Sequence, residues 1–140
     1  MKVIDANVAA KWYLPEPGEA SAQDILESQD VLLAPSIIRL EVLAAIVRCV
    51  RDQRSTVAEA ELRCNRWHEL LNERGLVTVQ DDELLPDAIR LSLTLKHYLF
   101  DCLYLAVCLK YEATLVTFDT ELAKKAKAAT VRCQLLKEGS

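Results

Sequence analysis

The sequence predicts an α/β fold in which helices cover both faces of a central parallel sheet of four to five strands. One observation is that short apolar segments recur along the chain. They are residues 2–4, 31–34, 76–80, 113–117 and, as a possible fifth strand, 130–136. A second is that segments with helical patterning separate them, and this alternation is typical of a parallel sheet. The third is length, since 140 residues with 51% hydrophobic content suffice for one domain with its own core. We therefore expect residues 1–140 to form a single domain.

The first quarter of the chain alternates strand, helix and strand. Lys2–Ile4 fits a buried strand that ends at Asp5. A short helix is expected in the first half of the segment 11–19, where prolines and Gly18 then interrupt it. An amphipathic helix over Glu19–Ser28 and a strand over Val31–Ala34 follow.

Pro35–Ser36 open the next helix, roughly Ile37–Asp52, because proline suits a first helical position. This helix is apolar nearly all round, which indicates burial. Glu41 lies within it, and a buried carboxylate needs a partner or a metal ion. Arg48 is two turns further along the same face, where it can meet a phosphate or a partner chain.

The remaining elements follow the same alternation. A helix is expected from Thr56 to Arg74, with Ser55 or Thr56 as its N-cap and Gly75 as its stop, and the two successive helices offer a natural protein interface. The acidic run 81–83 fits the N-terminus of a helix that continues over 84–96. A break at 97–100, an apolar helix over 101–111, a strand over 113–117 and a helix over 121–129 complete the chain.

Composition narrows the function. The net charge of −4 argues against a general electrostatic binder of nucleic acid, although basic residues are locally dense. Those residues are Arg39, Arg48, Arg51, Arg54, Arg63 and Arg66. No apolar run approaches the roughly 20 residues that span a bilayer, and the N-terminus is unlike a signal peptide, so we expect a cytoplasmic protein without membrane contact. The five cysteines lack a CxxC motif and fit small buried side chains in a reducing compartment.

Four acidic residues lie where a metal site is expected. Asp5 and Asp119 follow strands, Asp101 opens an apolar helix, and Glu41 lies inside another. Each has an ordinary alternative: a helix N-cap for Asp5 and Asp119, the helix dipole for Asp101, an arginine partner for Glu41. Together they favour a metal site, because the carboxyl ends of parallel strands meet at one edge.

Oxygen ligands of this kind suit Mg²⁺ or Mn²⁺, and one or two such ions support phosphodiester hydrolysis. Asn7 and Thr117 fit as neutral groups that orient ligands or water. His97, just before Asp101, is expected to have a surface or packing role.

Four segments, in this order, carry a family resemblance: VIDANVAAKWYLPE, SIIRLEVLAAI, YLFDCLYLAVCLKY and ATLVTFDTEL. The chain resembles the PIN-domain ribonucleases of the VapC toxin type. The resemblance implies a PIN-like three-layer α/β/α sandwich and a Mg²⁺- or Mn²⁺-dependent endoribonuclease. It also implies a homodimer, and a cognate antitoxin that wraps the helices around the Glu41 segment. Cys102 and the pair Glu112–Ala113 depart mildly from the family pattern.

By the same resemblance, Asp5, Glu41, Asp101 and Asp119 are the catalytic and metal-holding acids, and Asn7 and Thr117 support them. Arg48 and Arg51 are candidate contacts with RNA or a partner. Two other functions are considered. One is a PIN-like interaction module that does not cut RNA. The other is a phosphoacceptor signalling domain, which would need an acceptor such as Asp81 and a lysine on its last strand, where the segment VRCQLL offers none.

Overall fold

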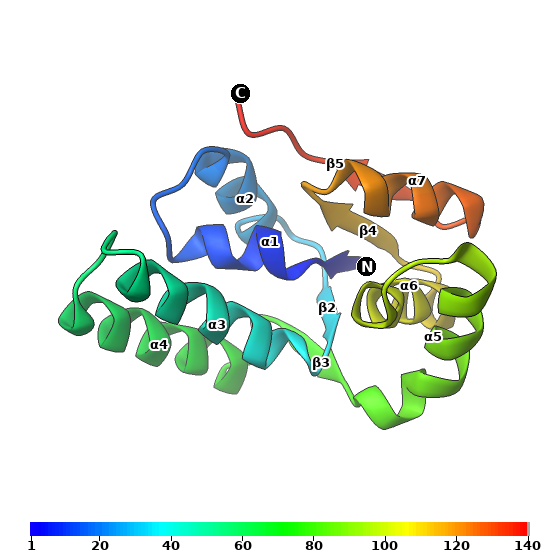
Figure 1. The fold of residues 1–140 in the computed structure, drawn as a ribbon, viewed down its shortest axis with the longest axis horizontal. Helices are drawn as coiled ribbons and strands as arrows, with labels where there is room; N and C mark the ends of the chain where they lie inside the picture. The colour runs from blue at the N-terminus through cyan, green and yellow to red at the C-terminus, as the bar shows by residue number, and fades with distance from the viewer. Residues whose placement is uncertain (140) are drawn as a thin grey trace.

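The computed structural model describes residues 1–139 and contains a five-stranded, fully parallel sheet with strand order β3-β2-β1-β4-β5 (Figure 1). The strands are β1 (Lys2–Ile4), β2 (Leu32–Pro35), β3 (Val77–Val79), β4 (Thr114–Thr117) and β5 (Cys133–Leu135). The α/β class is therefore confirmed, and the segment expected as a possible fifth strand does pair, as β5 with β4.

Helices cover both faces of this sheet. They are α1 (Ala6–Ala9) with the 3-10 turn η1 (Ala10–Trp12), α2 (Glu19–Leu26), α3 (Ile38–Arg51), α4 (Val57–Asn72), α5 (Asp81–Leu95), α6 (Leu99–Tyr111) and α7 (Thr120–Ala128). In Figure 1, α1 to α4 lie to one side of the strands and α5 to α7 to the other. The three-layer α/β/α arrangement is confirmed. The first helix begins at Ala6, directly after Asp5, which is earlier than expected.

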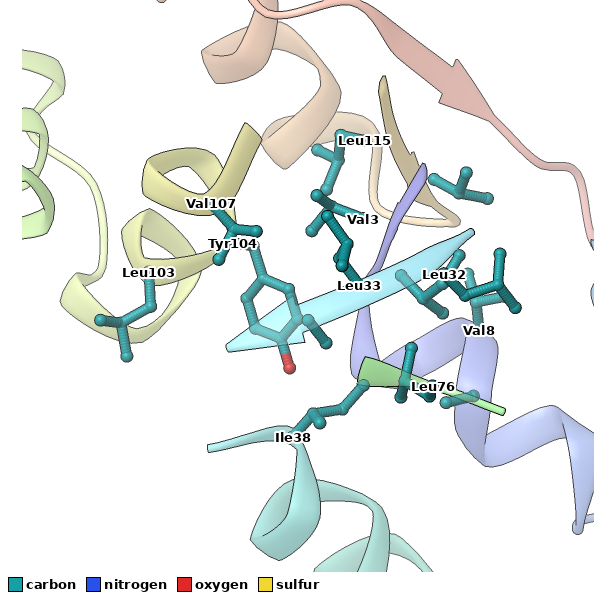
Figure 2. Close-up of a cluster of buried hydrophobic side chains, with 14 of the residues drawn as sticks. Val3, Val8, Leu32, Leu33, Ile38, Leu76, Leu103, Tyr104, Val107 and Leu115 are labelled. Carbon is teal, nitrogen blue, oxygen red and sulfur yellow. The ribbon is translucent and has the colours of Figure 1, made fainter. Parts of the chain in front are cut away.

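The core lies where α6 crosses the central strands. Residues 102–108 of α6 are all buried, and this helix contacts β1, β2 and β4. Figure 2 shows Tyr104 and Val107 of α6 beside Val3 and Leu33 of the sheet. The apolar run in the sequence therefore corresponds to a helix that other elements enclose. The packing of α6 on the strands places its first turn, with Asp101, at the carboxyl edge of the sheet.

Pro35 does not open the Glu41 helix as predicted, although α3 begins within one residue of the expected Ile37. Pro35 is the last residue of β2 and pairs with Val79, and α3 begins only at Ile38. The connection is fixed from another element, because Asp81 of α5 accepts a hydrogen bond from the backbone N–H of Ile37 at 3.2 Å. The backbone N–H of Asp81 in turn donates to Ser36 Oγ at 3.3 Å. Such a long-range cap is not visible in local sequence.

The predicted all-round burial of α3 is also wrong. Ile38, Val42 and Ile46 are buried, but the side chains of Leu40 and Val47 are 61% and 57% exposed. The helix forms a hairpin with α4, whose first turn has the expected Thr56 cap, and this hairpin covers only part of α3. An apolar face of α3 is therefore left open to solvent.

Helices α5 and α6 join at a tight turn in which Lys96 adopts a left-handed conformation with φ of 54°. Among residues 1–139, no single helix is long and apolar enough to cross a membrane, and α5 with α6 reaches that length and composition only as a pair bent by 116°. Asp101 lies in the first turn of α6, next to this bend between the two helices.

Candidate active site

Asp5 occupies the end of β1, where its backbone N–H donates to Val116 O of β4 at 3.0 Å. Asp5 is only 8% exposed. It stands at the N-cap position of α1, yet its side chain makes no cap hydrogen bond and instead accepts one from Thr117 Oγ1 at 2.7 Å. The pKa of Asp5 is raised to about 7, mainly by burial and also by the nearby carboxylates of Asp101 and Glu41, against the lowering effect of the hydrogen bond from Thr117. A buried carboxylate with a pKa this far from normal indicates a functional site.

Thr117 and Asn7 hold the ends of β1 and β4 together. Thr117 is fully buried, and its hydroxyl accepts hydrogen bonds from Asn7 Nδ2 at 3.3 Å and from the backbone N–H of Asp119 at 3.0 Å. The amide oxygen of Asn7 accepts from the backbone N–H of Phe118 at 3.3 Å. Both residues that were expected to support the acids therefore contact Asp5 or its immediate partner.

Glu41 lies half-buried in the first turn of α3 and is held by Tyr104 of α6. The Tyr104 hydroxyl donates to Glu41 Oε1 at 2.6 Å, and Figure 2 shows this ring projecting from α6 with its hydroxyl at the tip. Burial raises the pKa of Glu41, as do the charges of Asp101 and Asp81. The pKa of Tyr104 is raised well above its usual value by burial and by the acids around it, so the phenol stays protonated and remains a donor.

Asp101 contacts His97 across the turn that opens α6. The distance from His97 Nε2 to Asp101 Oδ2 is 2.7 Å, and the histidine side chain is 7% exposed. Burial raises the pKa of Asp101, His97 lowers it, and Asp119 raises it. The expected surface or packing role of His97 is therefore incomplete, because the ring is a direct partner of a candidate site residue.

Asp119 has both a structural contact and a place beside the other acids. Its Oδ1 accepts hydrogen bonds from the backbone N–H groups of Glu121 at 2.9 Å and Leu122 at 3.2 Å, so it caps α7. The helix N-cap role considered for both Asp5 and Asp119 is therefore confirmed for Asp119, whereas Asp5 makes no cap hydrogen bond. The cap fixes one carboxylate oxygen at the start of the helix.

A hollow of about 450 Å³ opens beside these acids. Glu41 and Asp119 line it, and so do three cations, Lys11, Arg48 and Arg54. Arg48 therefore lies where the sequence suggested, facing the same space as Glu41. Arg51 lines a different groove, of about 760 Å³ between α3 and α4, and is not brought to the acids.

The donor set is suited to a hard divalent cation, because four elements each supply a carboxylate. The charges of Asp101 and Glu41 raise the pKa of Asp5, and the charge of Asp119 raises the pKa of Asp101, so these groups lie near one another. Within residues 1–139, however, no three His, Cys, Asp or Glu side chains are arranged as ligands around one point. Each acid is held by a protein donor: Thr117 for Asp5, Tyr104 for Glu41, His97 for Asp101 and the α7 amides for Asp119. The residue types and charges fit a Mg²⁺ or Mn²⁺ site, and these donors set where each carboxylate stands.

Several residues around the acids were not identified from the sequence: Lys11, Glu16, Tyr104 and Glu138. Arg54 was noted only as one of the dense arginines, and His97 only as a surface or packing residue. Tyr104 is 63 positions from Glu41, within an apolar run that reads as core. Its hydroxyl was the available signal, since a buried phenol requires a hydrogen-bond partner.

The chain is similar to known proteins in sequence and in fold. A family model described as "PIN domain" matches residues 2–128. The fold is similar to a solved structure described as "Crystal Structure of FitAcB from Neisseria gonorrhoeae", with a TM-score of 0.61, 18% sequence identity, and coverage of 95% of this chain and 96% of that chain. A search by sequence among curated proteins gives no match. PIN domains are generally nucleases and typically use divalent metals. The family match spans most of the chain, and the protein therefore belongs to the PIN domain family.

Proposed function

We propose that this protein is a metal-dependent endoribonuclease that hydrolyses phosphodiester bonds within RNA. The observation that carries the proposal is the convergence of Asp5, Glu41, Asp101 and Asp119 at the carboxyl edge of the sheet, where burial and mutual repulsion raise the pKa of the first three. Such a cluster of negative charge is unfavourable without a cation, and family membership supports nuclease chemistry.

The four acids would hold Mg²⁺ or Mn²⁺. A bound divalent ion supplies positive charge at the scissile phosphate and lowers the pKa of water. The chain's own groups fix the carboxylates: the Thr117 hydroxyl orients Asp5, and the Tyr104 hydroxyl orients Glu41. Asn7 keeps Thr117 in place through its 3.3 Å hydrogen bond. Such contacts matter because small displacements of ligands reduce metal affinity and rate.

The basic side of the hollow supports an anionic substrate. Arg48 is exposed, lines the hollow with Glu41, and forms no ion pair among residues 1–139. A guanidinium group in this place can contact a backbone phosphate next to the bond that is cut. RNA, as opposed to another phosphodiester, is favoured by the resemblance to VapC-type ribonucleases.

We further propose that the protein is the toxin of a type II toxin–antitoxin pair and forms a homodimer. Two exposed apolar areas support partner binding. One lies on the α3–α4 hairpin, where Val47 and Val57 line the groove of about 760 Å³. The other lies around the α5–α6 turn, where Leu93 and Tyr98 are 76% and 77% exposed. We assign the first to a cognate antitoxin, because it adjoins the Glu41 helix. We assign the second to a second copy of the chain.

The five free cysteines are consistent with action in the cytoplasm, where thiols stay reduced. Cys49, Cys102 and Cys108 are buried and pack as small apolar side chains.

The ribonuclease proposal is tested by incubating total RNA with the purified protein in Mg²⁺ and in EDTA. We expect cleavage only with Mg²⁺, and a loss of roughly a thousandfold in rate for Asp5→Asn, because removing one ligand withdraws several kcal/mol of transition-state stabilisation. Asp24→Asn, on the exposed surface of α2, is the matched control and should cleave like the unchanged protein. Full activity of Asp5→Asn would contradict the proposal.

The two other functions give different results. An interaction module without nuclease activity would bind partners but leave RNA intact. A phosphoacceptor domain is disfavoured by the sheet, since its order of β3-β2-β1-β4-β5 differs from the 2-1-3-4-5 order of flavodoxin-like folds. The last strand, β5, also contains no lysine.

A further inference from the structure

A buried lysine on the basic side of the hollow is paired with the C-terminal segment of the chain. The side chain of Lys11 is 7% exposed, and its Nζ lies 3.4 Å from Glu138 Oε1 and 3.9 Å from Glu16 Oε1. The same ammonium lies 5.0 Å from the centre of the Phe118 ring. Lys11 and Glu138 line the same hollow as Glu41 and Asp119. A cation is thus held next to the acids, with a carboxylate against it.

The stem of Lys11 is fixed in place, which distinguishes it from the exposed arginines. Phe118, which it faces, directly precedes Asp119 and donates its backbone N–H to Asn7. Arg54 already pairs with Glu16 at 3.3 Å and with Asp52 at 3.7 Å. Lys11 is therefore the cation whose position is tied most directly to the network around Asp5.

The partner carboxylate comes from a segment that crosses from β5 toward α2. In Figure 1 the C-terminal trace leaves β5 and runs to the side of α2. Leu136 donates its N–H to Thr117 O at 2.8 Å, which anchors the segment at the carboxyl end of β4. Further on it passes over Gly18, where a Cβ would lie 3.3 Å from Glu138 Cα and 2.8 Å from the Phe118 ring. Gly18, with φ of +92°, lets the chain approach this closely.

The two carboxylates that contact Lys11 differ in exposure. Glu138 is 61% exposed, so its bond to Lys11 is weak and exchangeable, whereas Glu16 is 29% exposed and also holds Arg54. A substrate phosphate that enters the hollow offers the same kind of acceptor oxygen as Glu138. We propose that Lys11 binds a backbone phosphate of the RNA and that Glu138 occupies this ammonium group until the substrate displaces the C-terminal segment. The inference rests on the proposed ribonuclease function.

The three glycines of the chain allow a direct test by nuclear magnetic resonance with ¹⁵N-glycine labelling. Gly139 reports on the C-terminal segment, Gly18 on the surface beneath it, and Gly75, at the end of α4, serves as an internal control. The intact protein is titrated with a short single-stranded RNA in Ca²⁺. We expect the Gly139 and Gly18 signals to move and the Gly75 signal to stay. RNA binding without movement of Gly139 would overturn the proposal.

Two variants test the pairing itself. Glu138→Gln should bind the RNA about threefold to fivefold more tightly, since the exposed Glu138 carboxylate no longer competes for Lys11. Lys11→Met keeps the apolar stem but loses the charge, so it should bind more weakly, with a salt slope smaller by about 0.7. Glu73→Gln, which removes an exposed carboxylate at the end of α4, is the matched control for net charge and should bind like the unchanged protein.

The outcomes separate this inference from the ribonuclease proposal. Equal affinity of Glu138→Gln and the unchanged protein, or no RNA binding by any form, would overturn the role of Lys11 and Glu138. Binding with release of the C-terminal segment but no cleavage in Mg²⁺ would support the role and contradict the ribonuclease function. Circular dichroism of Lys11→Met is the check that this variant is folded. Because Glu138 is exposed, Glu138→Gln tests the pairing without disturbing the core.

Discussion

The protonation of Asp5 is strongly coupled to folding. Its pKa rises from 3.8 to about 7 because the carboxylate is buried beside other acids. The folded protein therefore binds a proton between these two values that the unfolded chain releases. The stability that this proton provides is fully present below about pH 4 and is lost as the pH rises through 7.

We predict that the metal-free protein becomes less stable between pH 5 and pH 8, by roughly 2 to 3 kcal/mol from Asp5 alone. Asp5→Asn carries no charge at either pH and should lose this part of the dependence. Urea unfolding in EDTA at the two pH values measures the free energy of unfolding. The same pH dependence in both proteins would show that Asp5 is not buried as a carboxylic acid.

Tyr104 gives a second prediction at this scale. Tyr104→Phe removes the hydroxyl that holds Glu41 Oε1 at 2.6 Å, while it preserves the buried ring. The Mg²⁺ concentration needed for half-maximal RNA cleavage should rise about tenfold or more, as for other groups that orient metal ligands. Tyr111→Phe, at the end of α6, is the control and should leave that concentration unchanged. An unchanged Mg²⁺ requirement in Tyr104→Phe would show that the Tyr104 hydroxyl is not needed to position Glu41.

The candidate acids could be found from the sequence because each follows a predicted strand or lies within an apolar helix, where a carboxylate is expected to need a partner. Asp5 and Asp119 follow strands β1 and β4 closely, and their common edge follows from the parallel sheet. Their partners could not be found in this way. His97 reaches Asp101 only because of the turn at Lys96, and Tyr104 reaches Glu41 only because α6 packs against β2, the strand that precedes α3.

At the scale of elements, the α3–α4 hairpin shows what local pattern can and cannot predict. The start of α4 was predictable, because Thr56 and Glu59 form a capping box with hydrogen bonds of 3.1 Å and 2.9 Å. The exposure of α3 was not, since its apolar residues are spread round the helix and only tertiary packing decides which side is covered. Leu40 and Val47 are exposed, and Val47 lines the groove between α3 and α4.

This exposed side leads to a prediction about the partner. Val47→Asp should weaken binding of the cognate antitoxin by tenfold or more, since it places a charge in an apolar contact worth about 2 kcal/mol. RNA cleavage by the isolated protein should be unchanged, because Val47 does not line the hollow with Glu41. Co-purification with the protein encoded beside it, followed by titration, provides the measurement. Loss of cleavage together with unchanged antitoxin binding would contradict the assignment.

At the scale of the whole molecule, one sheet and one buried cluster, spanning residues 3 to 131, join all the elements. We therefore propose that the chain is one folding unit. Thermal unfolding should be a single transition, with the same midpoint by circular dichroism and by the fluorescence of Trp12 and Trp67. These two residues lie in η1 and α4, so separate midpoints would indicate that the α3–α4 hairpin unfolds independently.

The central claim is that Asp5, Glu41, Asp101 and Asp119 form one divalent-cation site, and calorimetric titration of the purified protein with Mn²⁺ tests it most directly. We predict saturable binding that weakens as the pH falls from 8 to 6, because protons compete for Asp5. Asp5→Asn should lose most of the affinity, and Asp24→Asn should retain it. Absence of Mn²⁺ binding to the unchanged protein at pH 8, or equal binding to Asp5→Asn, would contradict the claim.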